Sequence, residues 1–232
     1  MKVLFVGNSH TYFNDMPALF AWFAERAAGE RPEVTMLAYS NRDLVWHRTE
    51  YFSLRFNLLY GGYDYCVIQQ AAHPYPPVET TARFYREIMG LCRRCGVTPV
   101  AYMTWAEKRF PMNQQIMIDT CEALAREQNA LLAPIGSIWR TVRETYPEIE
   151  LYYVDGEHAS PYGDFLIASV LCKLLTGALP SVMSGAGLDF LQGGPFELDM
   201  PVVIEDKDAV RVQLNRDWTD RILDTVRAGM QG

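Results

Sequence analysis

The stretch Val3-Leu4-Phe5-Val6-Gly7-Asn8-Ser9-His10-Thr11 begins with an apolar run and ends in a polar turn. A continuous apolar run of this kind is typical of a strand that is covered on both faces, as in a parallel sheet. A helical pattern follows almost at once, from about residue 16 to 28. The turn is therefore expected at the carboxyl end of a strand, where open α/β sheets place their chemistry. A serine at this point presents its hydroxyl to a crevice instead of the core.

The rest of the chain alternates between short apolar segments and helical patterns. The predicted strands are 2–7, 33–38, 64–70, 97–103 and a weaker one at 131–134, and the predicted helices are 16–28, much of 43–60, 78–94 and 114–129. This alternation predicts an α/β fold: a three-layer α/β/α sandwich, with a flavodoxin-like parallel sheet of about five strands and helices on both faces. Because the crossovers are right-handed, the residues that follow the strands meet on one rim. Those residues are Ser9, Ser40, His73 and Trp105.

The C-terminal part has clear helix boundaries, followed by a change in character. Ser160 can cap a helix, Pro161 suits its first position, and Gly177 ends it. Residues 178–205 hold several glycines and prolines and are predicted to be an irregular excursion. Helical spacing returns at 208–228, where an apolar stripe predicts a C-terminal helix packed on the core. The stripe consists of Val210, Leu214, Trp218, Ile222 and Val226.

Length and charge bound the class of protein. A chain of 232 residues fits one α/β domain, so we expect residues 1–232 to form a single domain. A net charge of -7 without any basic run argues against nucleic acid as a partner. The first apolar run stops at Gly7, too short for a signal peptide, and no segment approaches the roughly 20 apolar residues that span a bilayer. The odd number of cysteines, five, indicates reduced thiols, so we expect a cytoplasmic protein that does not bind membranes.

Two other residue patterns are interpreted as structural. Cys92 and Cys95 have the spacing of a redox or metal motif, but no second ligand pair accompanies them, and structural zinc needs four ligands. His47 lies in a predicted helix and is expected on its surface or at a satisfied core position. We therefore predict no metal and no cofactor.

A second polar segment near the end of the chain complements Ser9. Asp155 lies three residues before His158, so a single turn lets the carboxylate accept a hydrogen bond from the near ring nitrogen. The far nitrogen is then free to take a proton from a serine hydroxyl, which is how a serine becomes a nucleophile. The alternative is a simple turn at Asp155-Gly156 with a polar His158 before the next helix. The presence of Ser9 favours the catalytic interpretation.

These blocks resemble the SGNH (GDSL-like) hydrolase superfamily. Gly7-Asn8-Ser9 and Asp155-Gly156-Glu157-His158 look like its first and last blocks, with asparagine in place of the more familiar aspartate before the serine. Asp64 to Gln70 looks like its third-strand block, and Tyr102 to Ala106 resembles its fourth strand end. The resemblance covers roughly residues 1 to 177. It implies a serine hydrolase of ester bonds with Ser9 as nucleophile, His158 as base and Asp155 as the residue that orients it.

The chain departs from the family where the oxyanion hole is expected. The family uses a glycine amide after the second strand, whereas this chain has Ser40 and Asn41 there. The place of the family's asparagine after the third strand is taken by His73. The candidate donors are therefore the amides of Ser9, Ser40 and Asn41 and the side chains of Gln69 and His73, because oxyanion sites need preorganised N–H groups. The alternative is that Gln69 and His73 only satisfy local backbone groups.

The residues near these loops suggest a substrate. Ligand pockets are mostly apolar with a few placed polar groups, and the rim is predicted to hold several rings that can form an apolar or sugar-stacking wall. The pocket candidates are His10, Tyr12, Trp46, Tyr75 and Trp105. We expect a small-molecule ester as substrate, with a short acyl group and an acetylated carbohydrate as the favoured example. The alternative for these aromatic residues is that they belong only to the core.

Two other function classes remain open from the sequence alone. One is a non-catalytic domain that binds a small molecule or carbohydrate on the same fold, with a degenerate oxyanion hole. The other is a nucleotide or phosphate binder that uses the turn from Gly7 to Thr11 at a helix N-terminus. The turn lacks the glycine density of phosphate-binding loops, and this second alternative leaves Asp155 and His158 unexplained.

Overall fold

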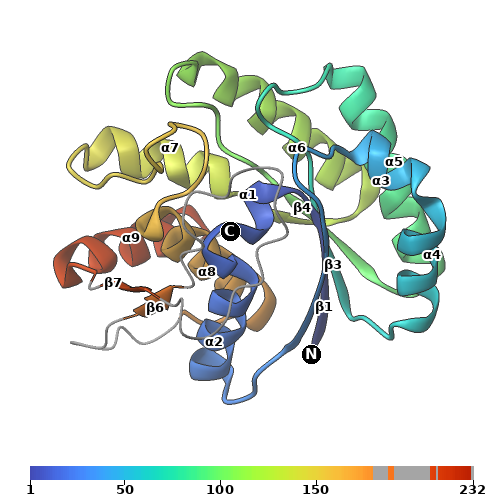
Figure 1. Ribbon diagram of the computed structural model, residues 1–232, viewed down its shortest axis with the longest axis horizontal. Coiled ribbons are helices and arrows are strands. Elements are labelled where there is room, and N and C mark those ends of the chain that lie inside the picture. The colour runs from blue at the N-terminus through green and yellow to red at the C-terminus, as the bar shows by residue number, and fades with distance from the viewer. Residues whose placement is uncertain (180–187, 191–209, 213, 231–232) are drawn as a thin grey trace.

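The computed structural model describes residues 1–179, 188–190, 210–212 and 214–230 (Figure 1). Its main sheet is parallel and has the strand order β2-β1-β3-β4-β5. The strands are β1 (Lys2–Gly7), β2 (Glu33–Ala38), β3 (Tyr65–Gln69), β4 (Thr98–Tyr102) and β5 (Leu131–Ala133). This is the flavodoxin-like order, so the predicted α/β fold with about five parallel strands is confirmed.

Alternating side chains of the central strand β1 explain the three layers. Val3 and Phe5 belong to the core on one face, and Leu4 and Val6 belong to the core on the other. The first face is covered by α2 (Met16–Ala28), α7 (Ile135–Thr145), α8 (Pro161–Thr176) and α9 (Arg216–Gly229), and the second by α3 (Leu44–Thr49), α4 (Tyr51–Tyr60), α5 (Val78–Arg94) and α6 (Gln114–Gln128) (Figure 1). A strand with apolar residues on both sides needs helices on both faces, because successive side chains point in opposite directions.

Two helix predictions differ from the structure. The predicted helix 43–60 is two helices, α3 and α4, because Glu50 between them leaves the helical conformation at φ -73° and ψ 46°. Helix α7 was not predicted, since Pro134 and Gly136 at its start are typical of a turn. The glycine is there for packing: a Cβ at Gly136 would lie 2.4 Å from the carbonyl oxygen of Thr104.

The C-terminal prediction is partly corrected. The helix predicted at 208–228 begins only at Arg216, where the Asn215 side chain caps it by accepting from the Trp218 amide. Val210–Val212 is instead a strand, β7, which pairs antiparallel with β6 (Leu188–Phe190). From the predicted stripe, Ile222 and Val226 are buried in the core, as expected for a helix that docks there. Most of the excursion predicted at 178–205 lies outside the described residues.

Several further predictions concern the chain as a whole. None of the helices in the described ranges is long and apolar enough to cross a bilayer. All five cysteines are free thiols. The single-domain organisation and the cytoplasmic location stay predictions.

Candidate functional site

The turn after β1 is held in place from the end of β3. The Gln69 side-chain oxygen accepts hydrogen bonds from the Asn8 amide at 2.8 Å and from the Thr11 hydroxyl at 3.1 Å. Asn8 in turn caps the short helix α1 (Ser9–Tyr12), since its side chain accepts from the His10 amide at 3.0 Å. Ser9 therefore begins a helix directly after a strand, which presents its hydroxyl at the carboxyl edge of the sheet.

Gly7 is required by the close approach of β3 to this turn. A Cβ at Gly7 would lie 2.4 Å from both the Gln69 Oε1 and the Thr11 Oγ1. Gly7→Ala is therefore expected to destabilise the protein by about 1–3 kcal/mol, because overpacking forces the neighbouring side chains apart. Urea unfolding measures this change. In the control Gly90→Ala, the new Cβ has its nearest atom at 3.5 Å, and a helix interior favours alanine over glycine by about 0.5–1 kcal/mol. Equal stability of the two variants would contradict the steric argument.

The segment from Asp155 to His158 folds around one carboxylate. The Asp155 Oδ1 accepts from the amides of Glu157 at 2.8 Å and His158 at 3.0 Å, while its Oδ2 lies 2.6 Å from the His158 Nδ1. Gly156 makes the turn possible with a φ of +75°. Burial alone would raise the pKa of Asp155, but the hydrogen bonds from Glu157 and His158 lower it overall. The carboxylate is thus kept ionised beside the imidazole.

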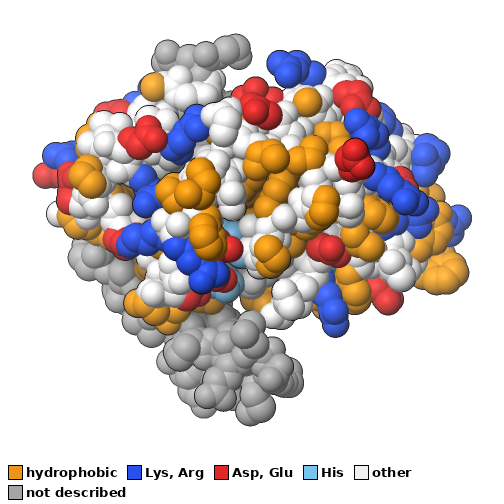
Figure 2. All heavy atoms as spheres, turned by 90° about the horizontal axis from the view of Figure 1, so that it is seen from above, with side chains coloured by type: hydrophobic (Ala, Val, Ile, Leu, Met, Phe, Trp, Pro, Cys, Tyr) orange, Lys and Arg blue, Asp and Glu red, His pale blue; other side chains and the backbone are white. Residues whose placement is uncertain are grey.

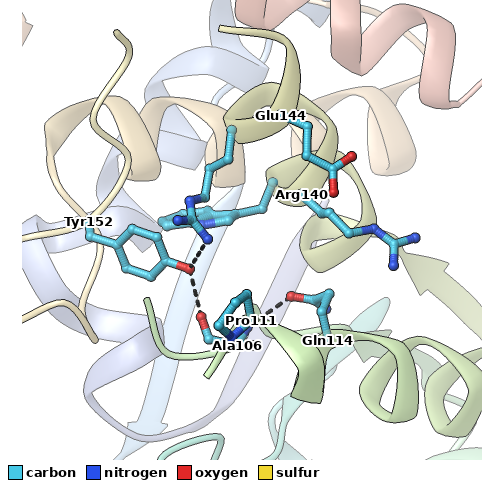
Figure 3. Close-up of a pocket in the computed structure, with 8 residues that line it drawn as sticks. Ala106, Pro111, Gln114, Arg140, Glu144 and Tyr152 are labelled. Atoms are coloured by element: carbon cyan, nitrogen blue, oxygen red, sulfur yellow. Dashed lines mark hydrogen bonds between the residues drawn. The ribbon is translucent and has the colours of Figure 1, made fainter. Parts of the chain in front are cut away.

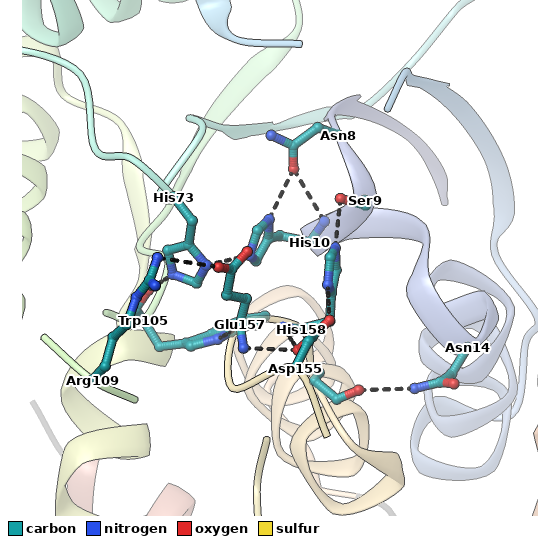
Figure 4. A network of polar contacts seen from close by, with 11 residues as sticks. Asn8, Ser9, His10, Asn14, His73, Trp105, Arg109, Asp155, Glu157 and His158 are labelled. Atoms are coloured by element: carbon teal, nitrogen blue, oxygen red, sulfur yellow. Dashed lines mark hydrogen bonds and ion pairs between the residues drawn. The ribbon is translucent and has the colours of Figure 1, made fainter. Parts of the chain in front are cut away.

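The two segments meet across 149 residues of sequence. The His158 Nε2 lies 2.8 Å from the Ser9 Oγ (Figure 4). Asp155, His158 and Ser9 therefore form one continuous hydrogen-bonded chain, with the imidazole between an acid and a hydroxyl. Such a chain is able to remove the serine proton and to hold the resulting positive charge on the histidine.

A buried polar contact ties the two segments together behind this chain. The Asn14 side-chain amide donates to the carbonyl of Ala159 at 3.1 Å and to the Asp164 Oδ2 at 2.5 Å. Asn14 adopts a left-handed conformation, with φ +50°, to reach them. Asp164 is buried, and burial raises its pKa well above the usual value, although the Asn14 hydrogen bond acts in the opposite direction. Its carboxyl group therefore stays protonated over a wider pH range than in the unfolded chain.

Asp164→Asn is expected to stabilise the protein at neutral pH. Because the folded pKa of Asp164 lies above the unfolded value of about 3.9, wild-type stability falls as the pH rises from there toward the folded pKa. A neutral asparagine removes this loss and still offers an oxygen to Asn14. The stability difference between variant and wild type, measured by urea unfolding, should therefore grow between pH 4 and pH 7. A difference that does not change with pH would contradict a protonated Asp164.

A cavity of about 620 Å³ opens at the Ser9 hydroxyl. It is lined by Asn8, Ser9, His10, Ser40, Asn41, Arg42, Ala71, His73, Glu157 and His158. Figure 2 looks onto this edge of the sheet and shows histidine side chains in a hollow beside acidic and basic ones. Only Ala71 among the lining residues has an apolar side chain. The predicted residues Ser40, Asn41, His73 and His10 thus lie with Ser9 and His158 around one cavity.

The structure separates the predicted oxyanion donors into two groups. The Gln69 amide is used within the fold, since its nitrogen donates to the Gln70 carbonyl and its oxygen holds the Ser9 turn. Both ring nitrogens of His73 also have partners, His10 and the Trp105 carbonyl. In this geometry both side chains already have partners, so their role as oxyanion donors stays a prediction.

The backbone amides next to the cavity are the remaining candidates. The N–H groups of Ser9, Ser40 and Asn41 have no acceptor within the part of the chain that the structure describes, and all three residues line the cavity. Asn41 has a φ of +56°, which marks a tight turn directly after β2. Amides that face a cavity unpaired are able to receive a negative charge there.

The predicted aromatic wall is not found among the lining residues. Trp105 is fully buried and stacks on Trp139, with ring centroids 4.2 Å apart. Tyr75 packs with the buried residues Ala72, Ala106 and Met117 instead, and Trp46 packs against Tyr39 and His47. Tyr12 does not line the cavity either. The core alternative for aromatic residues at strand ends is therefore the correct one for Trp105 and Tyr75.

Four lining residues were not predicted, although three of them adjoin a predicted one and the fourth lies two residues from one. Asn8 precedes the serine, Arg42 follows Asn41, and Glu157 precedes His158. Ala71 lies between Gln70 and the His73 loop. Burial, followed by the charges of Glu107 and Asp155, raises the pKa of Glu157. The signal that points to these residues is adjacency alone.

A second, smaller cavity lies beside the buried Trp139. It has a volume of about 230 Å³ and is lined by Ala106, Pro111, Gln114, Trp139, Arg140, Arg143, Glu144 and Tyr152 (Figure 3). The Tyr152 hydroxyl donates to the Ala106 carbonyl at 2.7 Å and accepts from Arg143 at 3.3 Å. This cavity shares no lining residue with the one at Ser9.

No group of three histidine, cysteine, aspartate or glutamate side chains in the described residues is arranged to hold a metal ion. Cys92 is buried in the core behind β3, where the pKa of its neighbour Cys66 is raised by the hydrogen bond that the Cys66 thiol donates to Cys92 and by burial. The Cys92–Cys95 spacing therefore belongs to helix packing.

Comparison with known proteins identifies the fold. No family model and no curated protein matches the sequence. Among solved structures, a predicted SGNH hydrolase from Slackia heliotrinireducens is 27% identical, with a TM-score of 0.65 over 75% of this chain and 98% of the other. An acetylxylan esterase from Geobacillus stearothermophilus is 12% identical, with a TM-score of 0.63 over 74% of this chain and 92% of its own. A lipase/acylhydrolase from Enterococcus faecalis is 14% identical, with a TM-score of 0.61 over 78% and 99%. The resemblance that the sequence blocks predicted is therefore confirmed.

Proposed function

We propose that this chain, which has the fold of the SGNH hydrolases and is similar to enzymes that hydrolyse ester bonds, is a serine esterase for a short-chain acyl ester. The observation that supports it is the chain from Asp155 Oδ2 to His158 Nδ1 at 2.6 Å and from His158 Nε2 to Ser9 Oγ at 2.8 Å. These hydrogen-bonded side chains lie at the carboxyl edge of a parallel sheet, where α/β enzymes bind their ligands.

The mechanism follows from these contacts. His158 takes the proton of Ser9 as its oxygen attacks the ester carbonyl, and Asp155 steadies the imidazolium that forms. The negative charge on the carbonyl oxygen is received by the amides of Ser9, Ser40 and Asn41. The bond to the alcohol then breaks, the alcohol leaves with the proton from His158, and the acyl group stays on Ser9. Water, deprotonated by His158, attacks the acyl carbonyl; the bond to the Ser9 Oγ breaks, Ser9 takes its proton back from His158, and the acid is released.

Labelling with a fluorophosphonate probe tests this proposal. Wild-type protein should be modified at Ser9 and should turn over p-nitrophenyl acetate, while Ser9→Ala should do neither. Ser40→Ala is the matched control, because it removes a nearby serine hydroxyl and keeps the backbone amide. Absence of labelling together with absence of turnover in wild type would reject the esterase proposal.

The character of the cavity favours a short acyl group on a polar alcohol. Its walls carry polar or charged side chains at nine of ten positions, so a polar alcohol finds hydrogen-bond partners there, whereas a long alkyl chain would cover polar groups without satisfying them. The structural likeness to an acetylxylan esterase agrees with an acetylated carbohydrate as substrate. We expect kcat/KM for p-nitrophenyl acetate to exceed that for p-nitrophenyl octanoate by at least about tenfold. The additional methylenes of octanoate gain affinity only where they are buried against apolar surface. A preference for octanoate would contradict this substrate class.

A non-catalytic binding domain is the second candidate. It is favoured by one observation: the two side chains predicted as oxyanion donors are engaged elsewhere. Such a domain would bind an ester or a carbohydrate in the same cavity but leave Ser9 unreactive. The fluorophosphonate experiment therefore separates the two candidates directly.

A further inference from the structure

Beside the proposed base His158 lies a pair of histidines, His10 and His73, joined in a row of polar contacts (Figure 4). The Asn8 Oδ1 lies 3.2 Å from the His10 Nδ1, and the His10 Nε2 lies 3.1 Å from the His73 Nδ1. The His73 Nε2 lies 3.2 Å from the carbonyl oxygen of Trp105. All four ring nitrogens of the pair are therefore engaged in this row.

Both ends of the row are acceptors. A backbone carbonyl such as that of Trp105 only accepts. At the other end, the Asn8 atom that faces His10 is the amide oxygen and not the nitrogen. This oxygen accepts from the His10 amide, while the Asn8 Nδ2 donates to the Arg42 carbonyl at 3.1 Å. Exchanging the two atoms would break both contacts. The orientation of the asparagine is thus determined by its surroundings.

Counting protons shows that the row is incomplete. Three contacts between these groups need three N–H protons, but two neutral imidazoles carry only two. One contact must therefore join two lone pairs unless the pair carries an additional proton. Burial, followed by the charges of His73 and His158, lowers the pKa of His10 well below its usual value. Burial lowers the pKa of His73 to about 4. At neutral pH the pair therefore holds two protons.

Charged groups on every neighbouring loop bear on this balance. The carboxylates of Glu107 and Asp155 favour a proton on His73, whereas His158 opposes it. Arg109 offsets part of the acidic charge, because it binds Glu107 at 2.6 Å. Arg42 and Glu157 line the same cavity with opposite charges. The acidic groups do not outweigh burial.

The pair also contacts the ring of the proposed base. The His10 ring stacks on that of His158 with centroids 4.9 Å apart and an angle of 18° between planes, and Phe13 stacks on His158 at 4.7 Å and 25°. His158 is thus held by Asp155 and Ser9 at its two ring nitrogens, and the rings of His10 and Phe13 stack on it. A positive charge on His10 would oppose the imidazolium that His158 becomes during the reaction.

We propose that His10 and His73 act as one histidine pair that positions the base His158, and that the pair works in a neutral form one proton short of filling its contacts. His73 holds His10 through the shared contact, and His10 supports the His158 ring. The proposal rests on the proposed function in naming His158 as the base.

Nitrogen-15 NMR of the full chain tests the proton count without any assay of activity. The chain has only four histidines, so its eight ring nitrogens can be assigned with the variants His10→Phe and His73→Gln. At pH 7, two of the four nitrogens of His10 and His73 should carry protons, and both rings should respond together when one proton enters near pH 4. Three protonated nitrogens at pH 7, or separate titrations near the unperturbed value of about 6.5, would overturn the proposal.

Kinetics of two variants test the positioning role. His10→Ala should lower kcat for p-nitrophenyl acetate by about 10- to 100-fold with little change in KM, because a small misplacement of a catalytic group has effects of this size. His10→Phe keeps a ring against His158 and should recover most of the loss. If both variants match wild type, or if His10→Phe is as slow as His10→Ala, the pair does not position His158. Normal labelling of Ser9 alongside such a result would reject this role and leave the esterase proposal intact.

Discussion

Replacing His158 by alanine is expected to lower kcat for an ester substrate by about 10⁴- to 10⁶-fold, because the serine then has no base and the leaving alcohol no acid. Among the residues that the structure describes, His158 is the single group in contact with both the Ser9 hydroxyl and the Asp155 carboxylate. The loss should appear in kcat more than in KM, since the imidazole bears its charge only during the reaction. Steady-state kinetics with p-nitrophenyl acetate measures both constants.

Two further variants define the role of His158 in this result. Asp155→Asn keeps the size of the side chain but favours the wrong imidazole tautomer, so we expect a loss of about 10⁴-fold. The double variant Ser9→Ala with His158→Ala should be no slower than either single variant, because residues that act as a unit are not additive. Retention of more than a tenth of wild-type kcat in His158→Ala would show that another group removes the Ser9 proton.

The fold, the turn at Ser9 and the contact between Asp155 and His158 were predictable because their signals are local. An apolar run followed by Gly7-Asn8-Ser9 indicates a strand, a close backbone approach and a capped helix within a few residues. The three-residue spacing of Asp155 and His158 is enough to form their contact in a single turn. Predictions that depend on residues close in sequence need no knowledge of the packing.

The oxyanion donors and the cavity wall depend on partners far away in sequence. The Gln69 side chain is used up by Asn8, 61 residues earlier, which no local pattern shows. Trp105 is buried because Trp139 stacks on it from helix α7, which the sequence did not indicate as a helix. A side chain at a strand end can point to the cavity or into the core, and only the packed structure decides which.

Trp105→Ala is expected to destabilise the protein by about 3–5 kcal/mol, the range for removing a large aromatic residue from a core. The Trp105 ring is fully buried and lies parallel to the Trp139 ring, with 6° between their planes. The alanine variant leaves a cavity that the neighbouring side chains do not fill, since the Tyr152 ring already packs against Trp139 with ring centroids 5.1 Å apart. Urea unfolding, followed by circular dichroism, measures the loss.

The same residue connects the core to the site, which gives the prediction a second part. The Trp105 indole N–H donates to the Glu157 carbonyl at 2.8 Å, directly before His158, and its own carbonyl accepts from His73. Trp105→Phe keeps most of the stacking but removes that indole donor, so it should recover most of the stability and less of the activity. A phenylalanine variant with wild-type kcat would show that the indole hydrogen bond does not help to hold His158. An alanine variant with wild-type stability would mean that the core repacks around the missing ring.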